Sequence, residues 1–287
     1  MRVGLIAADP GHPVLAAVAG LLEGRGCEVV HVAPAGGAGG ARDAGVAGEL
    51  VDVCLLKART GPALALAREW ERRGVPVVNS AAATELCQDR VRMADLARSA
   101  GLPFVPTAVG GRMAELTWQG RPFVVKSRHS RRHDLVALVD GEARLRELAA
   151  RWPEEPVVTQ PFVPGTGWDQ KLWVVDGQVF AARRRSELAA PDGGPEGGEG
   201  WVPSAGRTAL ALRVGEVFGL DVYGVDLLDG PDEPVVVDVN AFPGIRGQAG
   251  APQALAALAL RVGAGVGGAG AGVGAGVGAG VGTGGVG

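Results

Sequence analysis

The first 80 residues alternate between short apolar runs and segments in which apolar residues recur at helical spacing. Apolar runs of strand length lie at 2–8, 28–33, 51–57 and 75–80, and helical patterns that end on glycine lie at 13–26 and 61–74. Strands that alternate with helices predict βαβ units and a parallel sheet. No GxGxxG sequence follows the first strand, which gives little support to a dinucleotide site there.

A different pattern begins at Ala81, where helices are separated by pairs of strands. Helical patterns cover 84–103, 142–152 and 208–220, and strand patterns cover 122–141 around a basic turn, 156–164, 169–188, 222–228 and 235–240. Asp176-Gly177 divides the segment 169–188 and is a strong hairpin signal. The polar, glycine-rich segment 191–200 predicts a loop. The whole pattern predicts an α/β protein whose second part contains hairpins.

Polar side chains interrupt the last of these strands on one face only. Side chains alternate between the faces of a strand, so Asp238 and Asn240 share one face. If Leu228 of the preceding strand faces Val236 in an antiparallel hairpin, Asp226 lies opposite Asp238. Opposed carboxylates destabilise a sheet unless a cation offsets them, and Mg²⁺ prefers oxygen ligands. A solvated polar face is the alternative, and the pattern by itself leaves both open.

Composition restricts the class of protein. The 287 residues are 47% hydrophobic and 21% charged, with a net charge of −3, which is typical of a soluble globular protein with one to three cored domains. No basic excess indicates nucleic-acid binding, and the N-terminus has no signal-peptide pattern, so we expect a cytoplasmic protein without nucleic-acid or membrane partners. Three cysteines without CxxC spacing argue against a disulfide framework or a thiolate zinc site.

Lysine is rare in this chain. Its 28 basic residues include only Lys57, Lys126 and Lys171, so the other 25 are arginine. A lysine is a compact charge with rotatable donors, whereas arginine presents a planar fork, so the three exceptions are candidates for positions that need a point charge. The alternative is that they are solvated lysines.

The C-terminal segment 263–287 has a composition of its own. It contains 14 glycines in 25 residues and no charged or large side chain. Such a chain loses much backbone entropy on ordering and has little apolar surface to bury. We therefore expect a disordered tail and a folded part that ends near Val262.

An ordered series of motifs between Thr84 and Gly247 resembles the ATP-grasp superfamily. The motifs are CQDR at 87–90, PFVVKS at 122–127, TQPFVPG at 159–165, DQKLWVVDGQVFAARRRS at 169–186, GVDLL at 224–228 and VVVDVNAFPG at 235–244. Each motif is short, and their order and spacing carry the similarity. It is greatest to the RimK-like carboxylate-amine ligases, with a second similarity to inositol trisphosphate kinases of the same superfamily.

The resemblance implies an ATP-grasp fold, in which two α+β subdomains enclose ATP behind an N-terminal parallel-sheet βαβ domain. On this chain the N-terminal domain would cover 1–80 and the central subdomain 81–157. The C-terminal subdomain, with a metal site, would cover 158–262, followed by the tail at 263–287. The motifs span well over half of the expected folded part.

The resemblance also implies a set of nucleotide-binding side chains. Lys126 would lie along the ATP phosphates, and Gln160 and Phe162 would lie at the hinge beside adenine. Lys171 would reach a phosphate of the nucleotide or the substrate from its hairpin. Arg90 stands where many relatives carry lysine, which preserves the attraction to phosphate and changes its geometry.

A metal set and a catalytic cation follow from the same resemblance. The side chains implied for Mg²⁺, with Mn²⁺ as an alternative, are Asp226, Asp238 and Asn240. Arg184 would act together with Lys171 at the transferred phosphoryl group, and the kinase-like branch also implicates Ser186. Arg185 is the rival, because neighbouring residues of a strand take opposite faces and only one of the two can point at the ligand.

The basic turn at 127–134 offers a further choice. His129 and His133 have a spacing that binds metal on a helix, but the strand-turn-strand context disfavours a helix and no third ligand is evident. A loop that closes over phosphate and a solvated basic turn are the two remaining interpretations.

The resemblance implies an ATP- and Mg²⁺-dependent carboxylate-amine ligase. A substrate carboxylate would attack ATP to give an acyl phosphate, and an amine would attack that intermediate to form an amide, so the substrates would be small molecules or peptides. The second hypothesis is a kinase that phosphorylates a hydroxyl of a polyol or inositol phosphate. The third is a nucleotide-binding protein without turnover. The sequence leaves a homo-oligomer open.

Overall fold

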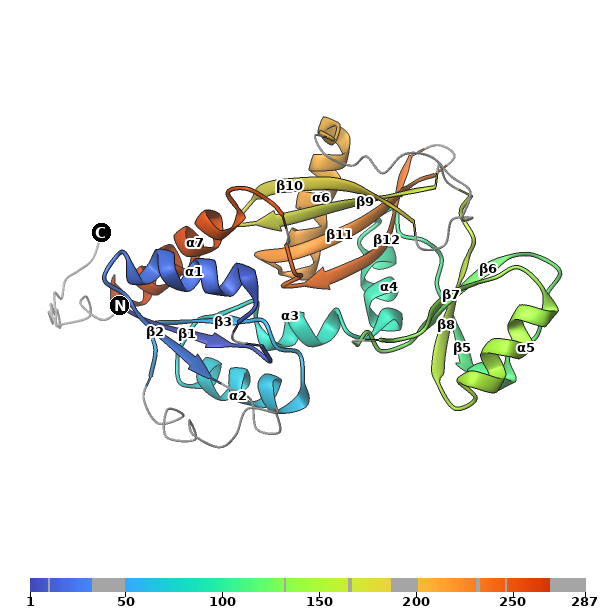
Figure 1. Ribbon diagram of the computed structural model, residues 1–287, viewed down its shortest axis with the longest axis horizontal. Helices are drawn as coiled ribbons and strands as arrows, with labels where there is room; N and C mark the ends of the chain where they lie inside the picture. The colour runs from blue at the N-terminus through green and yellow to red at the C-terminus, as the bar shows by residue number, and fades with distance from the viewer. Residues whose placement is uncertain are drawn as a thin grey trace, which may run out of the picture.

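The computed structural model describes residues 1–268 except 10, 33–49, 132, 165–166, 187–200, 231–232 and 246. Within these residues the chain forms three four-stranded sheets, and Figure 1 shows them as an elongated arrangement with the N-terminal sheet at one end. The loop predicted at 191–200 and the end of the tail, 269–287, lie outside the described residues. Among the described helices none has both the length and the apolar character needed to cross a bilayer.

The N-terminal sheet is parallel, with the strand order β2-β1-β3-β4. Its strands are β1 (Arg2–Ile6), β2 (Glu28–Val32), β3 (Val53–Leu56) and β4 (Val77–Val78), and its first helices are α1 (Pro13–Glu23) and α2 (Gly61–Arg72). Leu5 and Leu55 pack with α1, whereas Ile6 and Leu56 pack with α2. Both faces are covered, which explains the continuous apolar strands. The βαβ prediction is confirmed.

Helix α7 (Ala251–Gly268), at the C-terminal end of the described chain, lies on this N-terminal sheet beside α1 (Figure 1). Leu255 and Leu258 belong to the same buried cluster as Leu5. The helix passes Val262, so the expected end of the folded part was wrong by six residues. The helix passes close to β3 at Gly263, where a Cβ atom would lie 3.2 Å from a Val53 methyl group and 2.7 Å from the sulfur of the Met1 side chain.

The helix expected at 84–103 is broken into two. Helix α3 (Ala81–Leu86) ends before Asp89, and α4 (Arg90–Ser99) begins after it. The Asp89 carboxylate accepts a hydrogen bond from the Val91 amide at 3.0 Å and thereby caps α4. Arg128 binds the same carboxylate through Nε and Nη2, so the capping residue also ties α4 to the basic turn.

The central sheet is antiparallel, in the order β5-β8-β6-β7. It contains β5 (Ala108–Arg112), β6 (Phe123–Ser127), β7 (Val136–Val139) and β8 (Pro156–Pro161), with the short helix η2 (Met113–Glu115) and α5 (Glu142–Arg151). Met113, Val125 and Leu145 form its core. His133 has a positive φ of 59° in the turn before β7, so the helical metal spacing considered for the two histidines does not occur.

The third sheet has the order β10-β9-β11-β12 and is also antiparallel. It contains β9 (Trp168–Val175), β10 (Gln178–Arg185), β11 (Val222–Asp229) and β12 (Pro234–Ala241), and α6 (Ala205–Phe218) packs on it. Asp176 and Gly177 both have positive φ, 50° and 76°, as a two-residue hairpin of the primed type requires. The hairpin prediction is confirmed.

Two sets of hydrogen bonds, among other contacts, link the third sheet to the rest of the described chain. Val236 of β12 exchanges backbone hydrogen bonds with Pro103 and Val105, in the segment that leads into the central sheet. Asn79, at the end of β4, accepts hydrogen bonds from the backbone amides of Asp221 and Val222. The central sheet therefore meets β12 and the N-terminal sheet meets β11, which places both next to the strands that carry the candidate site.

Candidate active site

Five of the residues expected at the site lie on one face of the third sheet. The register pairs Lys171 of β9 with Asp226 of β11, and Asp226 with Asp238 of β12. Paired residues share a face, and residues two positions along a strand share it too, so Arg184 and Asn240 look the same way. From β10 to β12 this face presents two cations, then two carboxylates and an amide.

The predicted opposition of Asp226 and Asp238 is confirmed, but the register beyond it was wrong. A β-bulge follows Asp226, so that Leu228 faces Val235 and not Val236. A bulge places two residues of one strand against one of the other, which a period of two in the sequence does not reveal. The carboxylates are opposed because the shift begins only after them.

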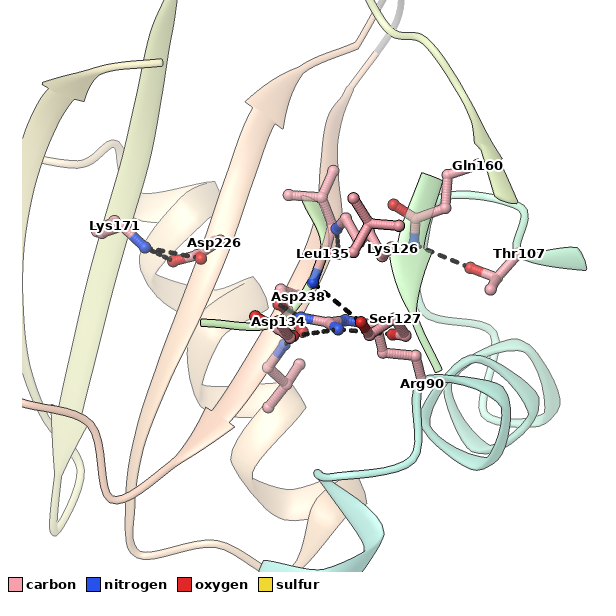
Figure 2. Close-up of polar contacts among 12 residues, drawn as sticks. Arg90, Thr107, Lys126, Ser127, Asp134, Leu135, Gln160, Lys171, Asp226 and Asp238 are labelled. Atoms are coloured by element: carbon pink, nitrogen blue, oxygen red, sulfur yellow. Dashed lines mark hydrogen bonds and ion pairs between the residues drawn. The ribbon is translucent and has the colours of Figure 1, made fainter. Parts of the chain in front are cut away.

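Lys171 is paired with Asp226 across the two strands. Its Nζ lies 2.7 Å from both carboxylate oxygens, and the two side chains are 17% and 21% exposed (Figure 2). Burial raises the pKa of the Asp226 carboxyl, the Lys171 ammonium opposes that rise, and Asp238 adds to it. Lys171 therefore offsets a charge that the strand pairing would otherwise leave next to a second carboxylate.

Arg90 holds the second carboxylate from the opposite side. Its guanidinium binds Asp134 at 2.7 Å, Asp238 at 3.2 Å and the Ser127 carbonyl at 2.7 Å, and Figure 2 shows it between these three groups. Burial by itself would raise the pKa of Asp238, but the charges of Arg90 and Lys126 outweigh it and the pKa is lowered. Asp238 is thus held ionised.

Lys126 reaches β12 from the central sheet. Its side chain is buried, and Nζ donates to the Val237 carbonyl at 2.9 Å, at the bulged position of β12. Burial lowers the pKa of this ammonium, whereas the negative charge of Asp238 opposes the change. The lysine stands on the side of Asp238 away from Lys171, so the carboxylates lie between two lysines (Figure 2).

The two hinge residues lie on and after β8. Gln160 is buried, and its side-chain amide donates to the Thr107 hydroxyl at 3.0 Å. Phe162 follows the strand and is partly buried. β8 leads out of the central sheet toward β9 of the third, which is where a hinge between the two is expected, and the adenine contacts of both residues stay a prediction.

A cleft of about 520 Å³ opens over the β9–β10 side of the same face. It is lined by Lys171, Arg184 and Asn240 together with the segment 241–245, which folds back over the sheet. Gly224 permits this approach, because a Cβ atom there would lie 3.2 Å from the ring of Pro243. Part of the expected site therefore borders a cavity large enough for a small ligand.

Two residues of the cleft come from the N-terminal sheet. Lys57 and Arg59 follow β3 and line the cavity opposite the third sheet. Lys57 donates to the carbonyls of Phe242 and Pro243 at 2.9 and 3.2 Å. The rarity of lysine had marked Lys57 as one of three candidates, but no local signal distinguished Arg59 from the other arginines.

Arg183 and Arg184 of β10 take opposite faces, as alternation requires, and the side chain of their rival Arg185 lies outside the described part of the structure. Arg184 lines the cleft, whereas the guanidinium of Arg183 stacks over Trp201, 4.9 Å from the ring centre. The preference for Arg184 agrees with this placement, and its catalytic role stays a prediction.

The donor set of Asp226, Asp238 and Asn240 fits Mg²⁺. The structure contains no group of three His, Cys, Asp or Glu side chains at a metal-binding spacing within its described residues. A third protein ligand beside the two carboxylates would therefore be the Asn240 amide. Each of the two carboxylates already attracts a cation, Asp226 the Lys171 ammonium and Asp238 the Arg90 guanidinium. Carboxylates also bind hard divalent ions readily, so the pair suits Mg²⁺.

Residues 113–253 match the family described as the RimK-like ATP-grasp domain. This part of the chain is similar to a RimK-like ATP-grasp domain. The match includes the β6–β8 region and the whole β9–β12 sheet, which carry every expected site residue except Arg90. The ATP-grasp fold prediction is confirmed.

Curated proteins with similar sequences include ligases. A probable alpha-L-glutamate ligase of Thioalkalivibrio sulfidiphilus (strain HL-EbGR7) is 30% identical over 197 residues, which are 64% of this chain and 65% of that protein. The chain thus spans about 65% of the length of this curated relative. No support for the second similarity, to inositol trisphosphate kinases, comes from these proteins.

Solved structures cover more of the chain. The RimK domain protein ATP-grasp of Sphaerobacter thermophilus DSM 20745 is 27% identical, with a TM-score of 0.66 over 91% of this chain and 100% of that chain. The ATP-grasp ligase PsnB, in complex with a minimal precursor, Mg and ADP, is 19% identical, with a TM-score of 0.65 over 91% of this chain and 97% of that chain. At that identity the second likeness speaks for the fold alone.

Proposed function

We propose that this protein is an ATP-dependent carboxylate-amine ligase. The observation that carries the proposal is the row of charged side chains across β9, β11 and β12, which lies between Lys126 on one side and the basic cleft on the other. A nucleotide phosphate at Lys126 and a second anionic substrate in the cleft would then meet over Asp226 and Asp238. The relatives named alpha-L-glutamate ligase make L-glutamate the first substrate to test.

The proposed reaction needs positioning and charge compensation more than a protein nucleophile. A substrate carboxylate oxygen attacks the γ-phosphorus and ADP leaves; an amine nitrogen then attacks the acyl carbon, and phosphate leaves with the formation of the amide. Lys126 and Lys171 supply positive charge on either side of the reacting groups. Arg184 and the walls of the cleft hold the substrate and limit the access of water to the acyl phosphate.

Asp226, Asp238 and Asn240 would hold the Mg²⁺ ion, which supplies charge neutralisation at the phosphates. Mn²⁺ shares the preference for oxygen ligands and is an alternative. On this proposal Lys171 and Arg90 neutralise the carboxylates in the absence of the ion. Composition supports a cytoplasmic location, and the division at 1–80, 81–157 and 158–262 remains part of the proposal, with α7 added to the N-terminal unit.

The test is product analysis with the purified protein, ATP and Mg²⁺. A panel of carboxylic acids is offered with L-glutamate as the amine, and mass spectrometry identifies the products. An amide formed together with ADP supports the ligase, and ¹⁸O in the substrate carboxylate is expected to appear in the released phosphate. A phosphorylated alcohol from a parallel polyol panel would instead indicate the kinase, and nucleotide binding without any product would indicate a protein without turnover.

Asp238→Asn provides the residue-level test of the metal set. We expect turnover to fall by at least about 100-fold, because loss of the Asp238 carboxylate would weaken binding of the Mg²⁺ ion that neutralises the negative charge of the phosphates. Asp95→Asn is the matched control, because Asp95 is 56% exposed and forms an ion pair with Arg98 one turn away on the same helix. Turnover of Asp238→Asn equal to that of the control would refute the assignment.

A further inference from the structure

One face of the central sheet carries a second polar side chain besides Lys126. The register of β6 and β8 pairs Val124 with Gln160 and Lys126 with Val158, so these four side chains share a face. Gln160 is only 4% exposed, and both valines are buried. Gln160 and Lys126 are therefore diagonal neighbours on this face, with two apolar side chains beside them.

Thr107 lies opposite Gln160 on the neighbouring strand. The antiparallel register pairs Ala108 of β5 with Thr159 of β8, so the residue before Ala108 faces the residue after Thr159. The side-chain amide nitrogen of Gln160 donates to the Thr107 hydroxyl at 3.0 Å. The same hydroxyl donates to the Val105 carbonyl at 3.1 Å. The two hydrogen bonds form a chain from Gln160 through Thr107 to the backbone.

The hydroxyl proton fixes the direction of this chain. A backbone carbonyl can only accept, so Thr107 gives its single proton to the Val105 carbonyl. The hydroxyl oxygen then has only lone pairs left, and the group that faces it must be the N–H of the amide. If the Gln160 amide were turned over, two oxygens would face each other without a proton between them. Thr107 therefore holds the Gln160 amide in one of its two orientations.

This orientation leaves the carbonyl oxygen of the Gln160 side chain available. Figure 2 shows that oxygen turned away from Thr107, to which the amide nitrogen is joined. Within the described residues no donor reaches it. Buried polar atoms in folded proteins nearly always have a partner, so an amide oxygen without one in a side chain this buried is an acceptor that a ligand can use.

An acceptor with a fixed orientation distinguishes purine bases. Adenine carries an amino group, which donates, at the ring position where guanine and hypoxanthine carry a carbonyl oxygen, which only accepts. A site built to form a hydrogen bond discriminates strongly against a ligand that cannot form it, because the site's own polar group is then left unpaired. An amide that could turn freely would accept from one base and donate to the other.

We propose that Thr107 is a positioning residue that makes the nucleotide site select adenine over bases with a carbonyl in place of its amino group. Thr107 acts through Gln160 and does not touch the nucleotide itself. The inference rests on the proposed ATP-dependent function, in which the base lies beside Gln160 and the phosphates lie beside Lys126. It adds to that function the residue that decides which base is accepted.

The test is isothermal titration calorimetry of the full chain with Mg²⁺ and either ADP or IDP, whose base is hypoxanthine. Wild type is expected to bind ADP at least about tenfold more tightly than IDP, because one hydrogen bond is replaced by the repulsion of two acceptors. Thr107→Val keeps the shape of the side chain and removes the hydroxyl, so this ratio should fall to about threefold or less. Thr107→Ser keeps the hydroxyl and should keep the wild-type ratio. Thr117→Val, at an exposed threonine before β6, is the matched control.

The ratio of the two affinities separates a positioning role from a structural one. A loss of stability weakens the binding of both nucleotides alike and leaves their ratio unchanged. Gln160→Met lacks the amide, so its ratio should be low, and adding Thr107→Val should not change it further, because the two substitutions remove the same interaction. Thr107→Ala removes the hydroxyl with less bulk and is the second variant, should Thr107→Val fail to fold by circular dichroism.

The inference is overturned if wild type binds ADP and IDP equally, or if the variants without the hydroxyl keep the wild-type ratio. It is also overturned if Thr107→Ser loses the ratio as Thr107→Val does, or if Thr107→Val changes the ratio in the Gln160→Met background. The ligase proposal fails separately, through the absence of an amide product. If the ratio follows the Thr107 hydroxyl and no amide forms with any acid, the base-selective site stands and the reaction assigned to it does not.

Discussion

Replacing Asn79 by alanine tests whether the N-terminal sheet supports the strand that carries Asp226. The Asn79 side chain is 1% exposed, and its Oδ1 accepts hydrogen bonds from the amides of Asp221 and Val222, both at 2.9 Å. Its Nδ2 donates to the Val222 carbonyl at 2.6 Å. These three bonds fix the first residues of β11, two strand positions before Gly224.

The cost of the substitution follows from the groups that lose a partner. The Val222 carbonyl keeps the Phe242 amide at 2.8 Å, so only two amides, those of Asp221 and Val222, are left without an acceptor. At about 1–3 kcal/mol for each unsatisfied buried group, and less for the partly buried Asp221 amide, we expect a loss of about 2–4 kcal/mol. For a chain of this size that corresponds to a fall in Tm of roughly 5–15 °C.

Urea unfolding followed by circular dichroism measures this change, with thermal unfolding as a second assay. Gln178→Ala is the matched control, because it removes an amide side chain that is exposed on β10 and is expected to cost less than about 0.5 kcal/mol. If Asn79→Ala were destabilised no more than Gln178→Ala, the bonds from Asn79 to β11 would not be supporting that strand, and the reasoning would be refuted.

Two further predictions concern the fold around the site. Gly215→Ala would place a Cβ atom 2.1 Å from the Tyr223 hydroxyl and should lower the free energy of unfolding by about 1–3 kcal/mol. Gly206→Ala in the same helix has open space around it and should leave the free energy of unfolding unchanged or raise it. Equal effects of the two substitutions in urea unfolding would contradict the contact. Burial by itself would raise the pKa of the Asp89 carboxyl, but hydrogen bonds from Arg128 and from the helix amides outweigh it and lower the pKa below its usual value. The ionised carboxylate therefore stabilises the fold at neutral pH, and this stabilisation is lost as the pH falls through the pKa of Asp89 in the folded protein. Asp89→Asn keeps a capping side chain, so its urea midpoint should fall less than that of wild type between pH 5 and pH 3, and parallel curves would contradict the assignment.

The order of helices and strands could be predicted from local pattern, with particular exceptions. The helix at 84–103 was predicted as continuous because its apolar spacing does not change at Asp89, and only the contact with Arg128 shows why the chain turns there. The end of α7 was misplaced because glycine-rich sequence has a low helix propensity. Close packing against Met1 and the N-terminal sheet supports the helix where propensity does not.

The amino-acid sequence by itself determined which side chains share a face. Alternation along β11 and β12 brought Asp226, Asp238 and Asn240 together, and separated Arg184 from Arg183, because a period of two is a property of any extended strand. A site that lies on paired neighbouring strands can therefore be predicted before the fold is known.

Only the tertiary structure decided what stands opposite that face. Arg90 reaches Asp238 across 148 residues and Lys57 reaches Phe242 across 185, and Arg59 joins the same cleft from β3. Such neighbours depend on how sheets and helices pack, and packing is set by many weak apolar contacts distributed over the chain, so no short stretch of sequence records them.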